Sequence, residues 1–272
     1  MSEQDRIQGL LKEYGYIAKK SFGQNFLINE GIIRRIVDQM KPETFETVIE
    51  IGPGLGALTL PLSQKSKKLY AVDADRDMIT ILHEIFDSKK NVTLVQSDFL
   101  RFDPDSVSRK EDRLLIGNLP YNITSELFEY MLEKGFASAG AMVQKEVYEK
   151  LSYTPGKSTN TALGAFIESM GKLSLLTLVD HSSFDPSPKV ESAFVRIDTD
   201  PKKSISFSLY PVYKALFRNP NKTIHNCLKE VPEYRDSLPT LSQEKPELLS
   251  SRARQLDVKT LQKLAEEIQK LS

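Results

Sequence analysis

Short apolar runs alternate with longer amphipathic segments over the first 200 residues, and this alternation limits the possible folds more than any other feature of the sequence. Strands that alternate with helices form right-handed crossovers, so the sheet should be mostly parallel and covered on both faces. Helical patterns occur at Gly31–Met40, after a candidate N-cap at Asn29, and at Ser125–Leu132. The runs expected to form strands are Thr47–Ile51, Leu69–Asp73, Val92–Gln96, Leu114–Gly117, Ala139–Gln144, Leu175–Val179 and Ala193–Ile197. We therefore expect an α/β domain with seven strands.

The pattern changes near the end of this domain. Too few residues join the last two strands to form a packed helix, which favours one antiparallel edge in a mostly parallel sheet. Residues 198–208 are polar and have no clear period, as in a linker. Short amphipathic helices are expected beyond it, at Tyr210–Phe217, Lys222–Lys229 and Val258–Leu271. We predict an α/β domain of residues 1–200, of which 1–28 form an N-terminal cap and motif segment, and a small helical domain of residues 201–272.

Composition excludes several classes of protein. With 40% hydrophobic and 27% charged residues the chain has the proportions of a soluble globular protein. No apolar run is long enough for a membrane span, and the first residues lack the layout of a secretory signal. Cys227 is the only cysteine, so no internal disulfide can form and a cytoplasmic location is expected. The three histidines lie far apart in the sequence, and no metal site is expected.

A glycine turn follows the first strand, in the sequence EIGPGLGA. Gly52 and Gly54 allow the backbone to turn sharply and a ligand to approach it closely. The next strand ends at Asp73, 21 residues after Gly52, where a carboxylate can accept hydrogen bonds from ribose hydroxyls. The third strand is followed by Asp98 and Phe99, which suit the amine and the ring of adenine. Two ligands fit this pattern, a dinucleotide and S-adenosylmethionine.

The fourth strand ends in Asn118, Leu119, Pro120 and Tyr121, and this corner fits methyl transfer to the exocyclic amine of a base. The N6 amine of adenine is a poor nucleophile because its lone pair is delocalised into the ring. Two acceptors, the Asn118 side-chain oxygen and the Leu119 carbonyl, would favour a pyramidal nitrogen. Pro120 would fix the carbonyl, and Tyr121 offers a ring on which an extruded base can stack. A hydride-transfer enzyme has no use for such a corner, which favours S-adenosylmethionine.

These motifs together resemble those of the ribosomal RNA adenine N6-dimethyltransferases. More narrowly, they resemble the bacterial branch that dimethylates two adjacent adenines near the 3′ end of small-subunit (16S) rRNA. The resemblance covers about residues 17 to 230. It is carried by the segments Lys19–Leu27, Glu50–Thr59, Gly117–Thr124, Gln144–Val147 and Phe184–Val190. It implies a Rossmann-like class I methyltransferase sheet, S-adenosylmethionine as donor, and action in late ribosome biogenesis.

The resemblance also implies roles for particular residues. The donor site would include Asn25, Leu27, Gly52, Asp73, Asp98 and Asn118, together with their neighbours Gln24, Gly54, Ala74 and Phe99. Tyr121 and Phe184 would sandwich the target adenine after it is flipped out of its RNA. Asn25, Leu27 and Phe184 come from the resemblance alone, and the segment Phe184–Val190 by itself suggests a proline-stiffened loop.

The expected RNA contacts depend on local charge, because the chain as a whole is neutral. Residues 201–272 hold 13 lysines and arginines against 8 aspartates and glutamates, an excess of +5. Asp73 stands where the family usually has glutamate, and residues 217–223 lack the paired arginines that commonly precede Lys-Thr. The candidate phosphate contacts are Lys19, Lys20, Lys189, Arg218, Lys222 and Arg252. The expected partner is small-subunit rRNA within a pre-30S particle, and we expect a monomer.

Three alternatives remain from the sequence. One is the related large-subunit rRNA adenine N6-methyltransferase of the macrolide-resistance type. Another is a noncatalytic RNA-binding assembly factor on the same fold. The third is an NAD-dependent oxidoreductase, because Gly52, Gly54 and Ala57 also satisfy the dinucleotide pattern.

Overall fold

The computed structural model describes residues 2–16, 25–118, 124–203 and 205–272. Contacts divide the chain into two compact units, one of residues 1–145 and 174–198 and the other of residues 146–173 and 199–272. The first unit contains the glycine turn and the ends of the first four predicted strands. The second contains the C-terminal helices.

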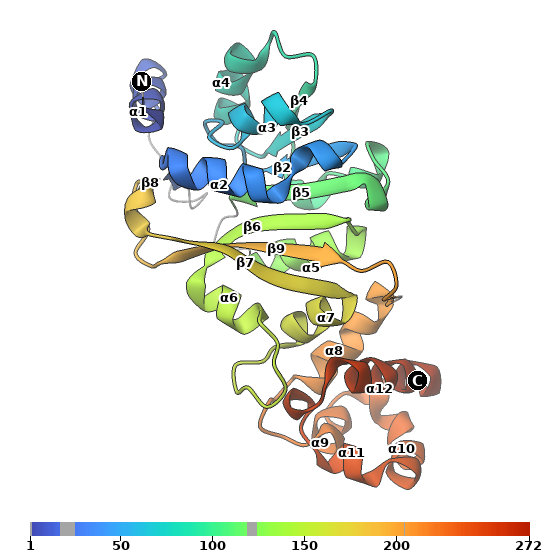
Figure 1. Ribbon diagram of the computed structural model, residues 1–272. Helices are drawn as coiled ribbons and strands as arrows, with labels where there is room; N and C mark the ends of the chain where they lie inside the picture. Colours follow the sequence, from blue (N-terminus) through green and yellow to red (C-terminus); the bar gives the residue numbers. More distant parts are fainter. Residues whose placement is uncertain (1, 17–24, 119–123, 204) are drawn as a thin grey trace. The chain divides into compact units, whose positions relative to one another are not determined.

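A seven-stranded sheet has the order β4-β3-β2-β5-β6-β9-β7 (Figure 1). Its strands are β2 (Thr47–Ile51), β3 (Leu69–Asp73), β4 (Val92–Gln96), β5 (Arg113–Asn118), β6 (Ser138–Gln144), β7 (Gly171–Val179) and β9 (Ser192–Thr199). The pairs from β4 to β6 are parallel, whereas β6 pairs with β9 in antiparallel fashion. The expected strands and the antiparallel pairing toward one edge are confirmed. The antiparallel strand β9 is inserted before β7, and β7 is the edge strand.

Helices of the first unit are α1 (Glu3–Glu13), α2 (Glu30–Met40), α3 (Thr59–Lys65), α4 (Arg76–Phe86) and α5 (Thr124–Lys134). The Asn29 side chain accepts a hydrogen bond from the Ile32 N–H at 3.1 Å and caps α2, as the sequence predicts. The apolar face of α2, from Ile33 to Met40, packs in one core cluster with residues of β2, β3, β5 and β6. Amphipathic periodicity therefore fixes this helix against the sheet.

A second, two-stranded sheet was not predicted. It pairs β1 (Phe26–Leu27) with β8 (Phe184–Asp185) in antiparallel fashion, so that Leu27 lies opposite Phe184. The Ile28 N–H donates to the Ser183 carbonyl at 2.8 Å and extends the pairing. Two motifs that are far apart in the sequence are thus joined by backbone hydrogen bonds.

The second unit is helical. Its helices are α6 (Lys145–Leu151), α7 (Ala162–Met170), α8 (Tyr210–Leu216), α9 (Ile224–Lys229), α10 (Leu238–Glu244), α11 (Pro246–Ser250) and α12 (Val258–Leu271). Phe166 of α7 packs edge to face on Tyr213 of α8, with ring centroids 5.2 Å apart. By contacts, residues 146–173 therefore group with the C-terminal helices, whereas the sequence-based division after residue 200 assigned them to the α/β domain. The functional division into domains stays a prediction.

Short 3-10 helices complete the secondary structure. They span Pro42–Thr44, Phe99–Arg101, Pro104–Ser106, Lys110–Asp112, His181–Ser183, Phe207–Leu209, Pro232–Ser237 and Ala253–Gln255. Within the described ranges, no helix has both the length and the hydropathy that a membrane span needs.

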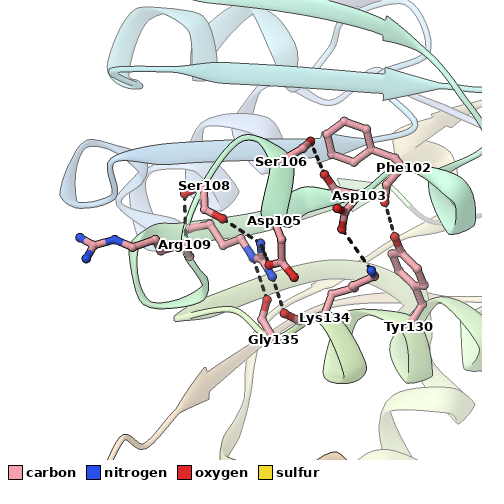
Figure 2. Close-up of polar contacts among 10 residues, drawn as sticks. Phe102, Asp103, Asp105, Ser106, Ser108, Arg109, Tyr130, Lys134 and Gly135 are labelled. Atoms are coloured by element: carbon pink, nitrogen blue, oxygen red, sulfur yellow. Dashed lines mark hydrogen bonds and ion pairs between the residues drawn. The ribbon is translucent and has the colours of Figure 1, made fainter.

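Arg113, the first residue of β5, is fully buried. Its guanidinium donates to the Gly135 carbonyl at 2.8 Å and to the Asp105 carboxylate at 2.8 Å, and it also donates to the Lys134 carbonyl. The side chain thereby caps the C-terminal end of α5, whose last carbonyls have no partner within the helix. Figure 2 shows this region, in which Lys134 also pairs with Asp103 at 3.1 Å. Arg113 anchors one end of β5, and Asn118 lies at the other.

Candidate active site

The glycine turn connects β2 to α3 and has the left-handed backbone that its sequence suggests. Gly52 and Gly54 have φ values of 66° and 54°, a region that L residues rarely adopt. A Cβ atom on Gly54 would also lie 3.3 Å from the Phe26 ring of β1. Both backbone geometry and the close approach of β1 therefore require glycine at position 54.

Asp73 at the end of β3 is bound to this turn. Its carboxylate accepts hydrogen bonds from the Gly54 N–H at 3.3 Å and from the Asp75 N–H at 2.8 Å. Burial raises the pKa of Asp73 to about 6. A carboxylate has about four lone-pair sites, so two donors leave acceptor capacity for ribose hydroxyls. The predicted ribose contact of Asp73 fits this geometry but stays a prediction.

Glu50 of β2 is a buried acid beside the same turn, with 1% of its surface exposed. Burial raises the pKa of Glu50 to about 8; the Thr59 side chain opposes this shift, and the negative charge of Asp73 adds to it. The Glu50 Oε2 and Thr59 Oγ1 atoms lack a hydrogen bond of normal geometry among the described residues, although the Thr59 side chain lies close enough to lower the pKa of Glu50. Buried polar atoms without a hydrogen-bond partner are rare in folded proteins. A polar ligand at the turn is one way to supply partners for these two atoms. This feature fits a site for S-adenosylmethionine, which carries polar groups at both ends.

Asn118 lies at the end of β5, next to the turn. A Cβ on Gly52 would be 3.7 Å from the Asn118 carbonyl oxygen, so the two segments are close neighbours. The Asn118 amide nitrogen donates to the Asn25 carbonyl at 2.9 Å. This bond fixes the direction of the amide and leaves its oxygen as an acceptor. The geometry is suited to accepting an N–H bond of an exocyclic amine.

Asp98 and Phe99 follow β4. The Asp98 carboxylate accepts from the Leu100 N–H at 3.0 Å, and about half of this side chain is exposed. Phe99 is buried, and its ring packs edge to face on Tyr130 with centroids 5.2 Å apart. Asp98 is therefore accessible to a ligand, whereas the Phe99 ring is engaged in core packing. The adenine contacts predicted for both residues stay predictions.

Leu27 and Phe184 lie opposite each other in the small sheet, with 2% and 3% of their surfaces exposed. Both belong to the core cluster that α2 forms with the main sheet. A base can stack on Phe184 only if the residues that cover its ring move. Stacking on Phe184 stays a prediction, and the sequence around it gave no sign of the strand pairing.

Several predicted site residues lie outside the described residues. These are Lys19, Lys20, Gln24, Leu119, Pro120 and Tyr121. Ala74 and Lys189 are described, and both are exposed.

The predicted RNA contacts of the second unit lie near one another in its loops. Lys222 forms an ion pair with Glu230, and the Arg218 Nε lies 4.0 Å from the same carboxylate. The Arg252 Nε donates to the Asn221 carbonyl at 2.9 Å. Three of the predicted cations are therefore gathered around residues 218–222, and their role in RNA binding stays a prediction.

Sequence reasoning missed the N-terminal residues that contact the glycine turn and the end of β3. The Arg6 guanidinium donates to the Leu55 carbonyl in the glycine turn at 2.9 Å. The Tyr16 hydroxyl donates to the Asp75 carboxylate at 2.6 Å. The available signal was a capping box, because Ser2 and Asp5 bond reciprocally and start α1.

Comparison with known sequences gives a family match. Residues 16–252 match the family model described as ribosomal RNA adenine dimethylase. The ribosomal RNA small subunit methyltransferase A of Thiobacillus denitrificans is 39% identical over 216 residues, which cover 77% of this chain and 84% of that protein. The protein of the same name from Lysinibacillus sphaericus is 35% identical over 235 residues, which cover 82% of this chain and 80% of that protein.

Solved structures show a similar fold. A dimethyladenosine transferase from Plasmodium falciparum has a TM-score of 0.76 and 25% identity, and the match covers 90% of this chain and 98% of that chain. The 23S rRNA methyltransferase ErmE has a TM-score of 0.66 and 23% identity, covering 90% of this chain and 100% of that chain. The likeness to ErmE bears on the fold alone.

Proposed function

Because the chain belongs to the ribosomal RNA adenine dimethylase family, we propose that it methylates N6 of two adjacent adenines near the 3′ end of small-subunit rRNA. The product is N6,N6-dimethyladenosine, and the methyl donor is S-adenosylmethionine. The observation that carries the proposal is the Asn118 amide, oriented by the Asn25 carbonyl beside the glycine turn. This arrangement brings an acceptor for the target amine next to a turn suited to the donor.

The donor contributes a methyl group on a sulfonium, which is already activated for transfer. The chain therefore needs to bind and orient the donor and the target adenine and to exclude water from the site. It needs no nucleophile of its own. The Asn118 oxygen accepts one N–H of the adenine amine and favours a pyramidal nitrogen, whose lone pair can then attack. The predicted second acceptor is the Leu119 carbonyl. The proton released on methylation passes to solvent.

On the donor side, the glycine turn admits the ligand to the backbone, Asp73 accepts from the ribose and Asp98 from the adenine amine. These are proposals for the residues, supported by their place at the carboxyl ends of β2, β3 and β4, where open α/β sheets bind ligands. We further propose that the enzyme acts in the cytoplasm, as a monomer, on a pre-30S particle.

The test is incorporation of labelled methyl from S-adenosylmethionine into under-methylated 30S particles, 50S particles and free rRNA, followed by digestion to nucleosides. Label in N6,N6-dimethyladenosine from the small subunit alone is the expected result. Label in the large subunit would instead support the macrolide-resistance alternative. Donor binding without transfer to any RNA would support a noncatalytic assembly factor.

A further inference from the structure

The N-terminal residues 2–16, here called the N-terminal strap, contact the glycine turn and several elements around it. Ile7 is fully buried in a cluster with Phe26 of β1, Leu55 of the glycine turn and Met78 of α4. The Gln8 amide donates to the Asp185 carboxylate of β8 at 3.2 Å. The strap therefore touches β1, β8, the glycine turn and α4 within one compact unit.

Arg6 holds the glycine turn from the side of the strap. The Arg6 Nη2 donates to the Leu55 carbonyl at 2.9 Å, and its Nε donates to Glu3 at 2.8 Å. The Glu3 backbone N–H in turn donates to the Glu30 carboxylate of α2 at 3.0 Å. Only 17% of the Arg6 side chain and 11% of the Glu3 side chain are exposed. Such a partly buried ion pair has a fixed geometry, which suits it to positioning a backbone group.

Three of the hydrogen bonds that fix the turn involve residues 53–56. Its Gly54 N–H donates to Asp73, its Gly56 N–H donates to the Pro53 carbonyl at 2.9 Å, and its Leu55 carbonyl accepts from Arg6. The Arg6 bond is the one of these three that comes from outside the β2–β3 region. It directs the Leu55 carbonyl toward the strap.

Tyr16 makes a second connection, to the acidic end of β3. Its hydroxyl donates to Asp75 Oδ2 at 2.6 Å, while Asp75 Oδ1 caps α4 by accepting from the Asp77 N–H at 3.0 Å. The Asp75 N–H donates to Asp73 at 2.8 Å. A chain of hydrogen bonds thus runs from the strap to the carboxylate assigned to the ribose.

We propose that the N-terminal strap is a working part of the donor site, in which Arg6 and Tyr16 are positioning residues that hold the glycine turn and Asp73 in the conformation that binds S-adenosylmethionine. Neither side chain is assigned a contact with the donor. The inference rests on the donor named in the proposed function. It predicts that loss of either tether weakens donor binding and leaves the methyl-transfer step unchanged.

The test measures the Kd of the full-length protein for S-adenosylmethionine by equilibrium dialysis. Arg6→Ala should raise Kd about fivefold to tenfold, which is less than the full effect of one charge-assisted hydrogen bond because the turn keeps its other hydrogen bonds. Tyr16→Phe, which removes a single hydroxyl, should raise Kd about twofold to fivefold. Arg6→Lys keeps the charge but not the planar fork, and should recover part of the affinity. In kinetics, KM for the donor should rise while kcat stays within about twofold.

Arg109→Ala is the matched control. Arg109 also pairs with an acid three residues away, Asp112, but its side chain is 77% exposed and lies outside the strap. The Kd of Arg109→Ala for S-adenosylmethionine should equal that of the unaltered chain. Hydrogen exchange adds a structural readout, because the amides of residues 54–57 should exchange faster in Arg6→Ala than in Arg109→Ala.

Two outcomes would overturn the proposal. One is a donor Kd unchanged in both Arg6→Ala and Tyr16→Phe, even if melting temperature falls, since the strap would then only add stability. The other is a loss of kcat with KM unchanged, which would place the effect on the methyl-transfer step. If the unaltered chain itself fails to bind S-adenosylmethionine, the proposed function fails instead.

Discussion

Asn118 owes its direction to a backbone carbonyl that lies far away in the sequence. An asparagine amide can be turned by 180° at little cost in shape, so its partner decides which atom meets the substrate. Here the Asn118 amide nitrogen donates a hydrogen bond to the Asn25 carbonyl at 2.9 Å. In the proposed mechanism, the motif around Asn25 therefore sets the direction of the Asn118 oxygen that accepts from the base.

Asn118→Ala should lower kcat about 100-fold, because an acceptor that acts on the reacting amine contributes mostly in the transition state. The donor Kd should change by less than about threefold, because the turn and Asp73 remain. Single-turnover methylation of 30S particles and equilibrium dialysis of the donor measure the two effects separately. Equal losses in turnover and donor binding would contradict the role assigned to the amide.

Glu50 makes stability depend on pH. Its pKa is raised from 4.5 to about 8 in the folded state, so between these values the folded chain keeps a proton that the unfolded chain has lost. Stability should therefore fall as pH rises through this window. Glu50→Gln removes this titration. The unfolding free energy of the variant minus that of the unaltered chain should therefore be larger at pH 8 than at pH 5, by more than about 1 kcal/mol.

Urea unfolding of both proteins at pH 5, 6.5 and 8 measures this difference in unfolding free energy. Glu46→Gln is the control, because Glu46 is exposed and its pKa is lowered by Lys68 and Lys67. Its effect on stability should not grow with pH in that window. A pH-independent difference for Glu50→Gln would show that this carboxyl titrates normally in the folded chain.

At the scale of elements, β5 is held at its start by a buried charge. Arg113 satisfies the carbonyls that end α5 and pairs with Asp105. Arg113→Met would leave those carbonyls and the half-exposed carboxylate without their donor, so it should cost about 2–3 kcal/mol of unfolding free energy. Arg109→Ala, which breaks an exposed ion pair nearby, should change the unfolding free energy by no more than about 0.5 kcal/mol.

Donor binding gives the second readout for Arg113→Met. Because Arg113 and Asn118 lie at opposite ends of β5, the variant that remains folded should bind S-adenosylmethionine with a nearly normal Kd. Urea unfolding and equilibrium dialysis on the same samples separate the two effects. A stability close to that of the unaltered chain would show that the buried guanidinium is replaceable by packing alone.

Periodicity predicted several elements closely, because a short apolar run marks a strand and an apolar stripe marks an amphipathic helix. The bounds of β2, β3, β4 and α12 agree with those expected from the sequence. The pairing of Phe26–Leu27 with Phe184–Asp185 was not predictable in this way, since two residues carry no period and the register comes from distant backbone. Helix α7 was missed as well, although Thr161 caps it, because its interior is buried almost all round.

The positions of the candidate site residues were predictable to the same extent, although their roles stay predictions. Those that follow a recognisable strand, such as Gly52, Asp73 and Asn118, could be placed from strand ends and residue chemistry. Arg6 could not, because its proposed role depends on a carbonyl 49 residues away and on the packing of Ile7. Contacts made by backbone groups leave no mark on the sequence of the segment that provides them.

At the scale of the whole molecule, some of the basic side chains of residues 201–272 have partners within the second unit. Three loops of the second unit interlock through Arg254, which donates to the Pro220 carbonyl at 2.9 Å while its own carbonyl accepts from the Gly156 N–H at 2.8 Å. Lys222 follows this junction and is paired with Glu230. A phosphate that binds Lys222 must therefore compete with that carboxylate.

This competition gives opposite predictions for the two partners. Lys222→Ala should weaken binding to 30S particles and reduce the slope of log K against log salt by about 1, as expected for one lost phosphate contact. Glu230→Gln should strengthen binding, because it removes the competing negative charge. Lys65→Ala, at the Asp38 pair of the first unit, is the matched control and should change neither affinity nor slope. Filter binding at several salt concentrations measures all three, with donor Kd unchanged throughout. If Glu230→Gln weakens binding as much as Lys222→Ala does, the pair supports the loop structurally and Lys222 does not contact the RNA backbone.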